Sequence, residues 1–149
     1  MGSTLYSVPV SDIEETGPSD ALLRRYMWGD EESVQRFHAR RRNPVSAPHA
    51  EMMGPANAAL WGRDVLPLKT VALANVAILA ALNRPAELHT RFRGLLRAGV
   101  PAQELAEICY QVAFYAGNPA GVEALTSLVD AVDENAELTA RLGPPRTDV

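Results

Sequence analysis

The apolar positions of this chain recur at helical spacing, and short turns rich in Gly, Pro and Asn separate the resulting segments. No segment alternates apolar and polar residues over enough positions to predict a strand. The pattern therefore predicts an all-α protein of about six to seven helices joined by short links. The predicted helices cover residues 20–28, 31–42, 46–61, 67–82, 86–98, 101–116 and 119–137.

Capping residues mark several of these helix boundaries. Asp30 is a good N-cap, and the acidic first turn and basic last turn (Arg40–Arg42) of the next helix follow the sign order that the helix dipole prefers. Gly54-Pro55 predicts a bend or break within 46–61. Asn118 followed by Pro119 predicts another N-cap, with proline at the first helical position.

Three of the segments carry the strongest apolar signal. The run "PLKTVALANVAILAAL" is apolar on nearly every face, which predicts the central helix of the fold. The next two segments are amphipathic, and each places four large residues on one inward stripe: Leu88, Phe92, Leu95 and Leu96, then Leu105, Ile108, Val112 and Tyr115.

Composition narrows the class of protein. A chain of 149 residues with 47% hydrophobic residues is enough for one domain with a real core, here predicted over 19–137, with an N-terminal arm over 1–18 and a tail over 138–149. A net charge of -4 argues against nucleic acid or an anionic membrane as the main partner. The N-terminus lacks a signal-peptide layout and no apolar run is long enough to span a bilayer, so we expect a cytoplasmic protein.

Metal and disulfide chemistry are not expected. The single cysteine cannot form an intramolecular disulfide or a cysteine-based zinc cluster. The three histidines, at positions 38, 49 and 89, do not form an i,i+4 pair of the kind that binds metal on a helix.

Residues 61–120 resemble the carboxymuconolactone decarboxylase family, with its alkylhydroperoxidase D-like fold. The resemblance rests on "LWGRDVLPLKTVALANVAILAALNR", on Glu104-Leu105-Ala106-Glu107 with Gln111, and on the corner Tyr115-Ala116-Gly117-Asn118-Pro119-Ala120. It implies an all-helical subunit that assembles as a homo-oligomer, a trimer or hexamer. It also implies chemistry on a small molecule without an organic cofactor, either decarboxylation of a lactone acid or thiol-based peroxidase chemistry.

The sequence departs from both branches of that family at the positions that carry chemistry. The peroxidase branch uses Cys-x-x-Cys, whereas here Cys109 is followed by Val112, so two-thiol cycling within one subunit is excluded. The decarboxylase branch places a histidine where this chain has Arg91. His89 lies about 200° away around the same helix, so it should not point into the same pocket. The chemistry has therefore moved or been lost.

The expected mechanism combines proton transfer with stabilisation of an enolate-like intermediate. Arginine, carboxylate, phenol and imidazole side chains are the candidates for these roles. Arg91 or Arg63 would hold an oxyanion or carboxylate, since a guanidinium binds two oxygens at once. Glu107, with Tyr115 or His49, would move the proton. Each has a plainer reading: a surface Glu107 that contacts Gln111, a packed tyrosine ring, and a surface histidine or arginine.

The remaining candidates would line a substrate pocket. Met52, Met53 and Trp61 would form an apolar wall if the Gly54-Pro55 bend faces it, although ordinary packing explains them equally well. Cys109 and Asn118 complete the substrate-binding candidates, although a packed core thiol and a helix cap are the favoured explanations for them.

The sequence thus predicts a cofactor-independent lyase or isomerase that acts on a small acidic, enolisable or conjugated molecule by decarboxylation, isomerisation or cyclisation. A helical assembly or binding protein without catalysis is the alternative. A single-thiol peroxidase is a third possibility, which would require an exposed Cys109 with a depressed pKa.

Overall fold

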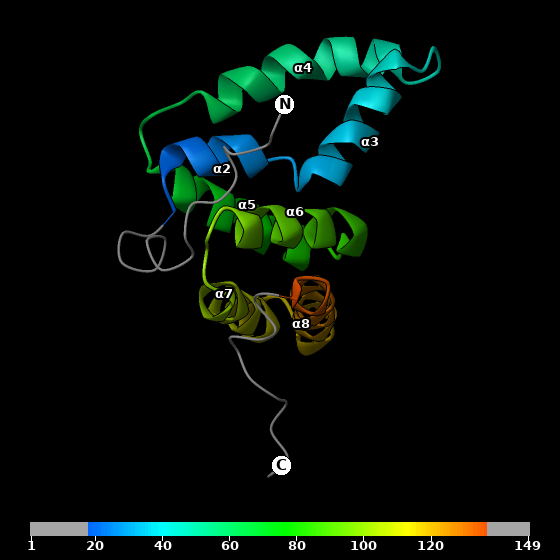
Figure 1. Ribbon diagram of the computed structural model, residues 1–149. Helices are drawn as coiled ribbons and strands as arrows, with labels where there is room; N and C mark the ends of the chain where they lie inside the picture. Colours follow the sequence, from blue (N-terminus) through cyan, green and yellow to red (C-terminus); the bar gives the residue numbers. More distant parts are fainter. Residues whose placement is uncertain (1–17, 137–149) are drawn as a thin grey trace.

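The computed structural model describes residues 18–136, which form seven α-helices and no strand (Figure 1). The all-α prediction is therefore confirmed, and the helices within residues 18–136 match the predicted six to seven. The predicted N-terminal arm up to residue 17 and the predicted tail lie outside the described residues. The helices are α2 (Asp20–Tyr26), α3 (Glu31–Arg42), α4 (Ala47–Trp61), α5 (Leu68–Ala81), α6 (Pro85–Arg97), α7 (Ala102–Tyr115) and α8 (Asn118–Asp133).

Helices α5 to α8 form the packed centre of the molecule. Helix α5 contacts α2, α6, α7 and α8, and α8 also packs against α6 and α7. Figure 1 shows α7 and α8 below α5 and α6, with α2 above them and α4 farthest from the centre. The central position predicted for the apolar helix is confirmed, although Ile78 and Leu82 stay exposed at its end. The largest fully buried side chains are Val76, Leu88, Leu95, Phe92, Leu105 and Cys109.

The N-cap predicted at Asp30 is confirmed, and the one predicted at Asn118 is wrong. Asp30 caps α3 by accepting a 3.0 Å hydrogen bond from the Ser33 N–H. Asn118, however, is the first residue of α8 rather than its cap. The cap is Gly117, whose φ of 114° lets the chain turn one residue earlier than the sequence suggests. Gly29, with a φ of 104°, lies in the turn between α2 and α3.

The inward stripe of α7 differs from the predicted one. Leu105 and Val112 are buried as expected, but Tyr115 is 80% exposed. The buried face of α7 consists of Ala102, Leu105, Cys109 and Val112, which has the same spacing as the predicted stripe but begins three residues earlier. Tyr115 lies in the last turn, past the point where this stripe contacts the core.

A close helix crossing positions the functional site. Gly94 of α6 lies against the backbone of Gly29 and of Tyr26, so closely that an added Cβ would lie 2.3 Å from the Tyr26 carbonyl oxygen. Only glycine at this position lets α6 approach the end of α2. The crossing brings Trp28, which follows α2, over the surface of α6.

Within the described residues, no helix is long and apolar enough to cross a membrane.

Candidate functional site

Both tryptophans of the chain lie together where α2, α4 and α6 meet. Trp28 follows the end of α2, and Trp61 is the last residue of α4. Their ring centroids are 6.3 Å apart with the planes tilted by 57°. Arg91 of α6 places its Cζ atom 5.5 Å from the centroid of each ring. One guanidinium thus makes cation–π contact with both indoles.

Two nitrogen atoms of the Arg91 guanidinium lack a hydrogen-bond partner among the described residues. Its Nε and Nη1 atoms are buried, and within residues 18–136 neither has an acceptor. Burial lowers the pKa of Arg91 to about 10, because desolvation disfavours the charged form, so the group remains charged at neutral pH. Buried polar atoms without partners are few in native folds, and they often mark a binding or catalytic site.

A pocket of about 340 Å³ opens beside the two indoles, and we call it the tryptophan pocket. Phe37 stacks on Trp28 with ring centroids 5.4 Å apart and planes within 7°. Arg41 lies over the Phe37 ring with its Cζ atom 5.6 Å from the centroid. The lining residues come from α2, α3, α4 and the turns that follow α2 and α4: Arg24, Met27, Trp28, Phe37, Arg41, Gly54, Asn57, Ala58, Trp61 and Gly62.

The charged residues at the tryptophan pocket are basic. Arg24 and Arg41 line it, and Arg91 lies behind its tryptophan wall, whereas no described lining residue carries a carboxylate. Flat aromatic faces suit a planar or conjugated molecule, and the cations suit an anion. The lining therefore matches the shape and charge of a small, flat anion.

Two of the predicted site residues, Trp61 and Arg91, belong to this site. Met52 and Met53 lie on α4 but are exposed and do not line the pocket. The reason is that α4 continues as one helix through Pro55 rather than breaking there. Its pocket-facing side is accordingly the helical repeat of Gly54, Asn57, Ala58 and Trp61.

Arg63 and His49 are also exposed and do not contribute to the pocket lining. Arg63 follows Gly62, which does line the pocket, so its backbone is adjacent while its side chain is not part of the wall. His49 lies near the start of α4, at the opposite end from Trp61.

The predicted residues of α7 and α8 lie on helices that contribute nothing to the pocket lining. Glu107, Tyr115 and Asn118 are exposed in this chain. Cys109 is fully buried, as predicted, and burial raises the pKa of its thiol to about 11. A thiol in that state is protonated at neutral pH, unlike the reactive thiolate that a peroxidase needs.

His89 and Arg91 point away from each other, as their spacing on the helix predicted. The Nδ1 atom of His89 donates to the carbonyl oxygen of Ser127 over 3.3 Å, and Nε2 lies 3.2 Å from Glu134. Arg91 turns instead to the tryptophans. Arg91 and His89 therefore lie in different surroundings on opposite sides of α6.

Sequence reasoning missed Trp28, Phe37, Arg24 and Arg41. Two signals were available. The chain has only two tryptophans, and Trp28 comes directly before Gly29, at a turn where a large ring can pack against other helices. Phe37 and Arg41 are four residues apart on α3, the spacing at which a cation can cover a ring on one helix face.

Comparison with known proteins agrees with the helical pattern. A model of the carboxymuconolactone decarboxylase family matches residues 49–130, which include Trp61 and Arg91 but not Trp28 or Phe37. A 4-carboxymuconolactone decarboxylase of Acinetobacter baylyi (strain ATCC 33305 / BD413 / ADP1) is 38% identical over 66 residues. This match covers 44% of the chain and 49% of the relative, so it spans about half the length of each. Because the family model matches more than half of the chain, this protein belongs to the carboxymuconolactone decarboxylase family.

Proposed function

We propose that this protein is a cofactor-independent, decarboxylase-like enzyme that acts on a small conjugated acid bound in the tryptophan pocket. The observation that carries the proposal is the Arg91 guanidinium, held against two indoles with its Nε and Nη1 unpartnered. An anion that reaches these atoms between the indoles would supply the missing acceptors. Membership of the family and the decarboxylase relative support the general class of reaction.

The role assigned to Arg91 is stabilisation of an oxyanion. In a decarboxylation, the bond between carbon and carboxylate breaks, and its electron pair moves through the conjugated system onto a carbonyl oxygen. Carbon dioxide leaves, and a proton then adds to carbon to restore the carbonyl. A permanent cation in a dry aromatic site favours the enolate more strongly than the same cation in water. Isomerisation and cyclisation pass through the same kind of charge, so Arg91 would serve them equally.

Proton transfer is assigned to Glu107, with Tyr115 or His49 as a second group, and Arg63 as a further clamp. All four side chains are exposed in the isolated chain. The face of α7 that carries Glu107 also exposes Tyr110, Phe114 and Tyr115, the last two by 82% and 80%. We propose that a homo-oligomer, a trimer or hexamer, covers this apolar face and brings Glu107 close to a bound substrate.

The first experiment uses the two tryptophans as reporters, because both lie in the pocket. Benzoate is titrated into the protein while tryptophan emission is recorded, and benzamide serves as the uncharged ligand of equal shape. We expect benzoate to bind more tightly, and Arg91→Met to reduce this preference by about 10- to 100-fold, the range of a charge-assisted hydrogen bond. Equal affinity of the wild type for benzoate and benzamide would refute the anion site.

The second experiment tests turnover. Wild type and Glu107→Gln are incubated with 4-carboxymuconolactone, the substrate in the name of the relative, and with other conjugated acids, and the loss of carbon dioxide is followed by mass spectrometry. We expect product with the wild type and about 100-fold slower release with Glu107→Gln, the usual contribution of a general acid or base. A rate unchanged in Glu107→Gln would remove that residue from the mechanism.

A binding protein without catalysis is the second candidate, and one observation favours it: the proposed proton-transfer residues lie on surfaces that do not line the pocket. The two experiments separate the candidates. Binding of benzoate without turnover of any conjugated acid supports the binding protein, whereas release of carbon dioxide supports the enzyme.

A further inference from the structure

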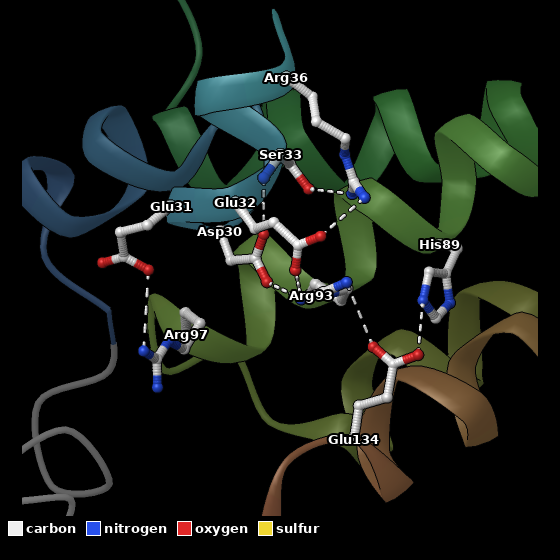
Figure 2. A network of polar contacts seen from close by, with 9 residues as sticks. All are labelled: Asp30, Glu31, Glu32, Ser33, Arg36, His89, Arg93, Arg97 and Glu134. Atoms are coloured by element: carbon white, nitrogen blue, oxygen red, sulfur yellow. Dashed lines mark hydrogen bonds and ion pairs between the residues drawn. The ribbon is translucent and has the colours of Figure 1, made fainter.

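A network of ion pairs joins the start of α3 to α6 and to the end of α8 (Figure 2). Arg93 of α6 lies at its centre. The Nη2 atom of Arg93 forms an ion pair with Asp30 and lies 3.4 Å from Glu32, and Nη1 lies 3.4 Å from Glu134. One side chain therefore connects three segments that are distant in sequence.

The rest of the same face of α6 continues this pattern. Residues 89, 93 and 97 follow each other at four-residue spacing, so their side chains line one side of the helix. Arg97 lies 3.7 Å from Glu31, and His89 lies 3.2 Å from Glu134 (Figure 2). The three acidic residues at the start of α3 are thus all paired with this face of α6.

Apolar packing does little to fix α3. Ser33 is its only buried residue, and α4, which α3 contacts, has only Trp61 buried. Hydrophobic burial is what normally holds a helix in place, and here it is nearly missing. The ion pairs at the N-terminal end of α3 must therefore contribute much of the positional restraint.

The position of α3 matters because this helix supplies two walls of the tryptophan pocket, Phe37 and Arg41. Phe37 stacks on Trp28, and Trp28 stands two residues before Asp30, the main partner of Arg93. A shift of Asp30 would therefore move both partners of the ring stack.

We propose that Arg93 is a positioning residue of the tryptophan pocket: by holding Asp30 and Glu32 against α6 and α8, it sets the place of Phe37, Arg41 and Trp28. The proposal rests on the proposed function of that pocket as the ligand site. Arg93 itself does not line the pocket, so its effect on a ligand passes through α3.

The test compares Arg93→Met with Arg36→Met. Arg36 also pairs with Glu32, at 2.9 Å, but both residues belong to α3 and the pair is exposed, so this control removes the same charge without releasing the helix. The first measurement is quenching of tryptophan emission by acrylamide in the ligand-free protein. The second is the dissociation constant for benzoate.

For Arg93→Met we expect stronger quenching by acrylamide and a benzoate affinity lower by about tenfold, because a displaced wall loses contact with the ligand. Arg36→Met should match the wild type in both measurements. Arg93→Lys should recover part of the loss, because an ammonium keeps the charge but cannot reach all three carboxylates in the same geometry. A folded Arg93→Met with wild-type quenching and wild-type affinity would overturn the proposal.

Asp30→Asn provides a second route if Arg93→Met does not fold. Asparagine caps a helix as well as aspartate does, so this variant keeps the α3 cap and loses only the charge that pairs with Arg93. The same change in quenching is expected, and its absence in the folded variant would also overturn the proposal. If the wild type fails to bind benzoate, the proposed function fails, but quenching of the ligand-free protein still decides the role of Arg93.

Discussion

Arg91 and Arg93 stand two residues apart on α6 and have opposite surroundings. Arg93 contacts the carboxylates of Asp30, Glu32 and Glu134. Arg91 contacts two aromatic rings, and within the described residues its Nε and Nη1 have no acceptor. Because two residues correspond to about 200° around a helix, the two side chains leave α6 on opposite sides.

The contrast separates a cation whose partners lie within the fold from one whose partner, in our proposal, is a ligand. A buried charge is costly unless its partners replace the lost water. Arg93 has those partners in the protein. Among the described residues, Arg91 has the partial compensation of cation–π contacts, and its Nε and Nη1 lack the acceptors that we propose a bound anion supplies.

The largest expected effect comes from Gly94→Ala, which breaks the close contact of α6 with the backbone of Tyr26 and Gly29. The added Cβ would lie 2.3 Å from the Tyr26 carbonyl oxygen and 2.7 Å from the Gly29 Cα, and backbone cannot move aside as a side chain can. We expect a loss of about 2–4 kcal/mol in the free energy of unfolding, measured by urea titration, despite the better helix propensity of alanine.

The same variant should also shift the tryptophan emission to longer wavelength, because Trp28 would separate from Arg91 and become more hydrated. A wild-type stability and emission spectrum for Gly94→Ala would show that the crossing of α2 and α6 is looser than the structure indicates.

The next prediction compares the effects of replacing Arg93 and Arg91 on the free energy of unfolding. Arg93→Met leaves three carboxylates without their shared cation, and we expect it to lower the free energy of unfolding by about 1–3 kcal/mol. Arg91→Met removes a desolvated charge that has no ion-pair partner among the described residues, and it places a sulfur-containing chain against two rings. We expect its effect to lie within about 1 kcal/mol of zero.

Urea unfolding of the two variants, side by side, measures this difference. An Arg91→Met variant that is destabilised as much as Arg93→Met would make Arg91 a structural residue, and the case for an anion site would then lose its main support.

Helical periodicity predicts the fold well. It predicts the difference between Arg91 and Arg93 only in part. The stripes of α6 and the central role of α5 follow from local spacing, which sequence displays directly. Spacing also shows that Arg91 and His89 face different ways. Which arginine finds a partner depends on Asp30 and Glu134, which are far away along the chain, and no local pattern reveals them.

The misplaced site residues have a similar cause. Met52 and Met53 were assigned to a pocket on the expectation of a helix break at Pro55, and the uninterrupted helix turns them outward. Tyr115 was placed on the inward stripe although it sits in the last turn of α7. In both cases the apolar or aromatic residue type suggests a buried position. The direction in which the helix turns the side chain leaves it exposed instead. Trp28 was missed because its partners Phe37, Trp61 and Arg91 come from three other helices.

The smallest expected effect is the pH dependence of the stability that the ion pair between Asp30 and Arg93 contributes. Burial alone would raise the pKa of Asp30, but the Ser33 N–H and the charge of Arg93 outweigh it and hold the pKa below the ordinary value of 3.8. The stability that this lowered pKa contributes is present above 3.8 and is lost as the pH falls toward the folded-state pKa. The difference in urea unfolding free energy between wild type and Asp30→Asn should therefore stay constant, at about 1 kcal/mol, from neutral pH down to about pH 5, and shrink below about pH 4. A difference that grows as the pH falls would mean that Asp30 is more basic in the folded protein, which is incompatible with a tight pairing to Arg93.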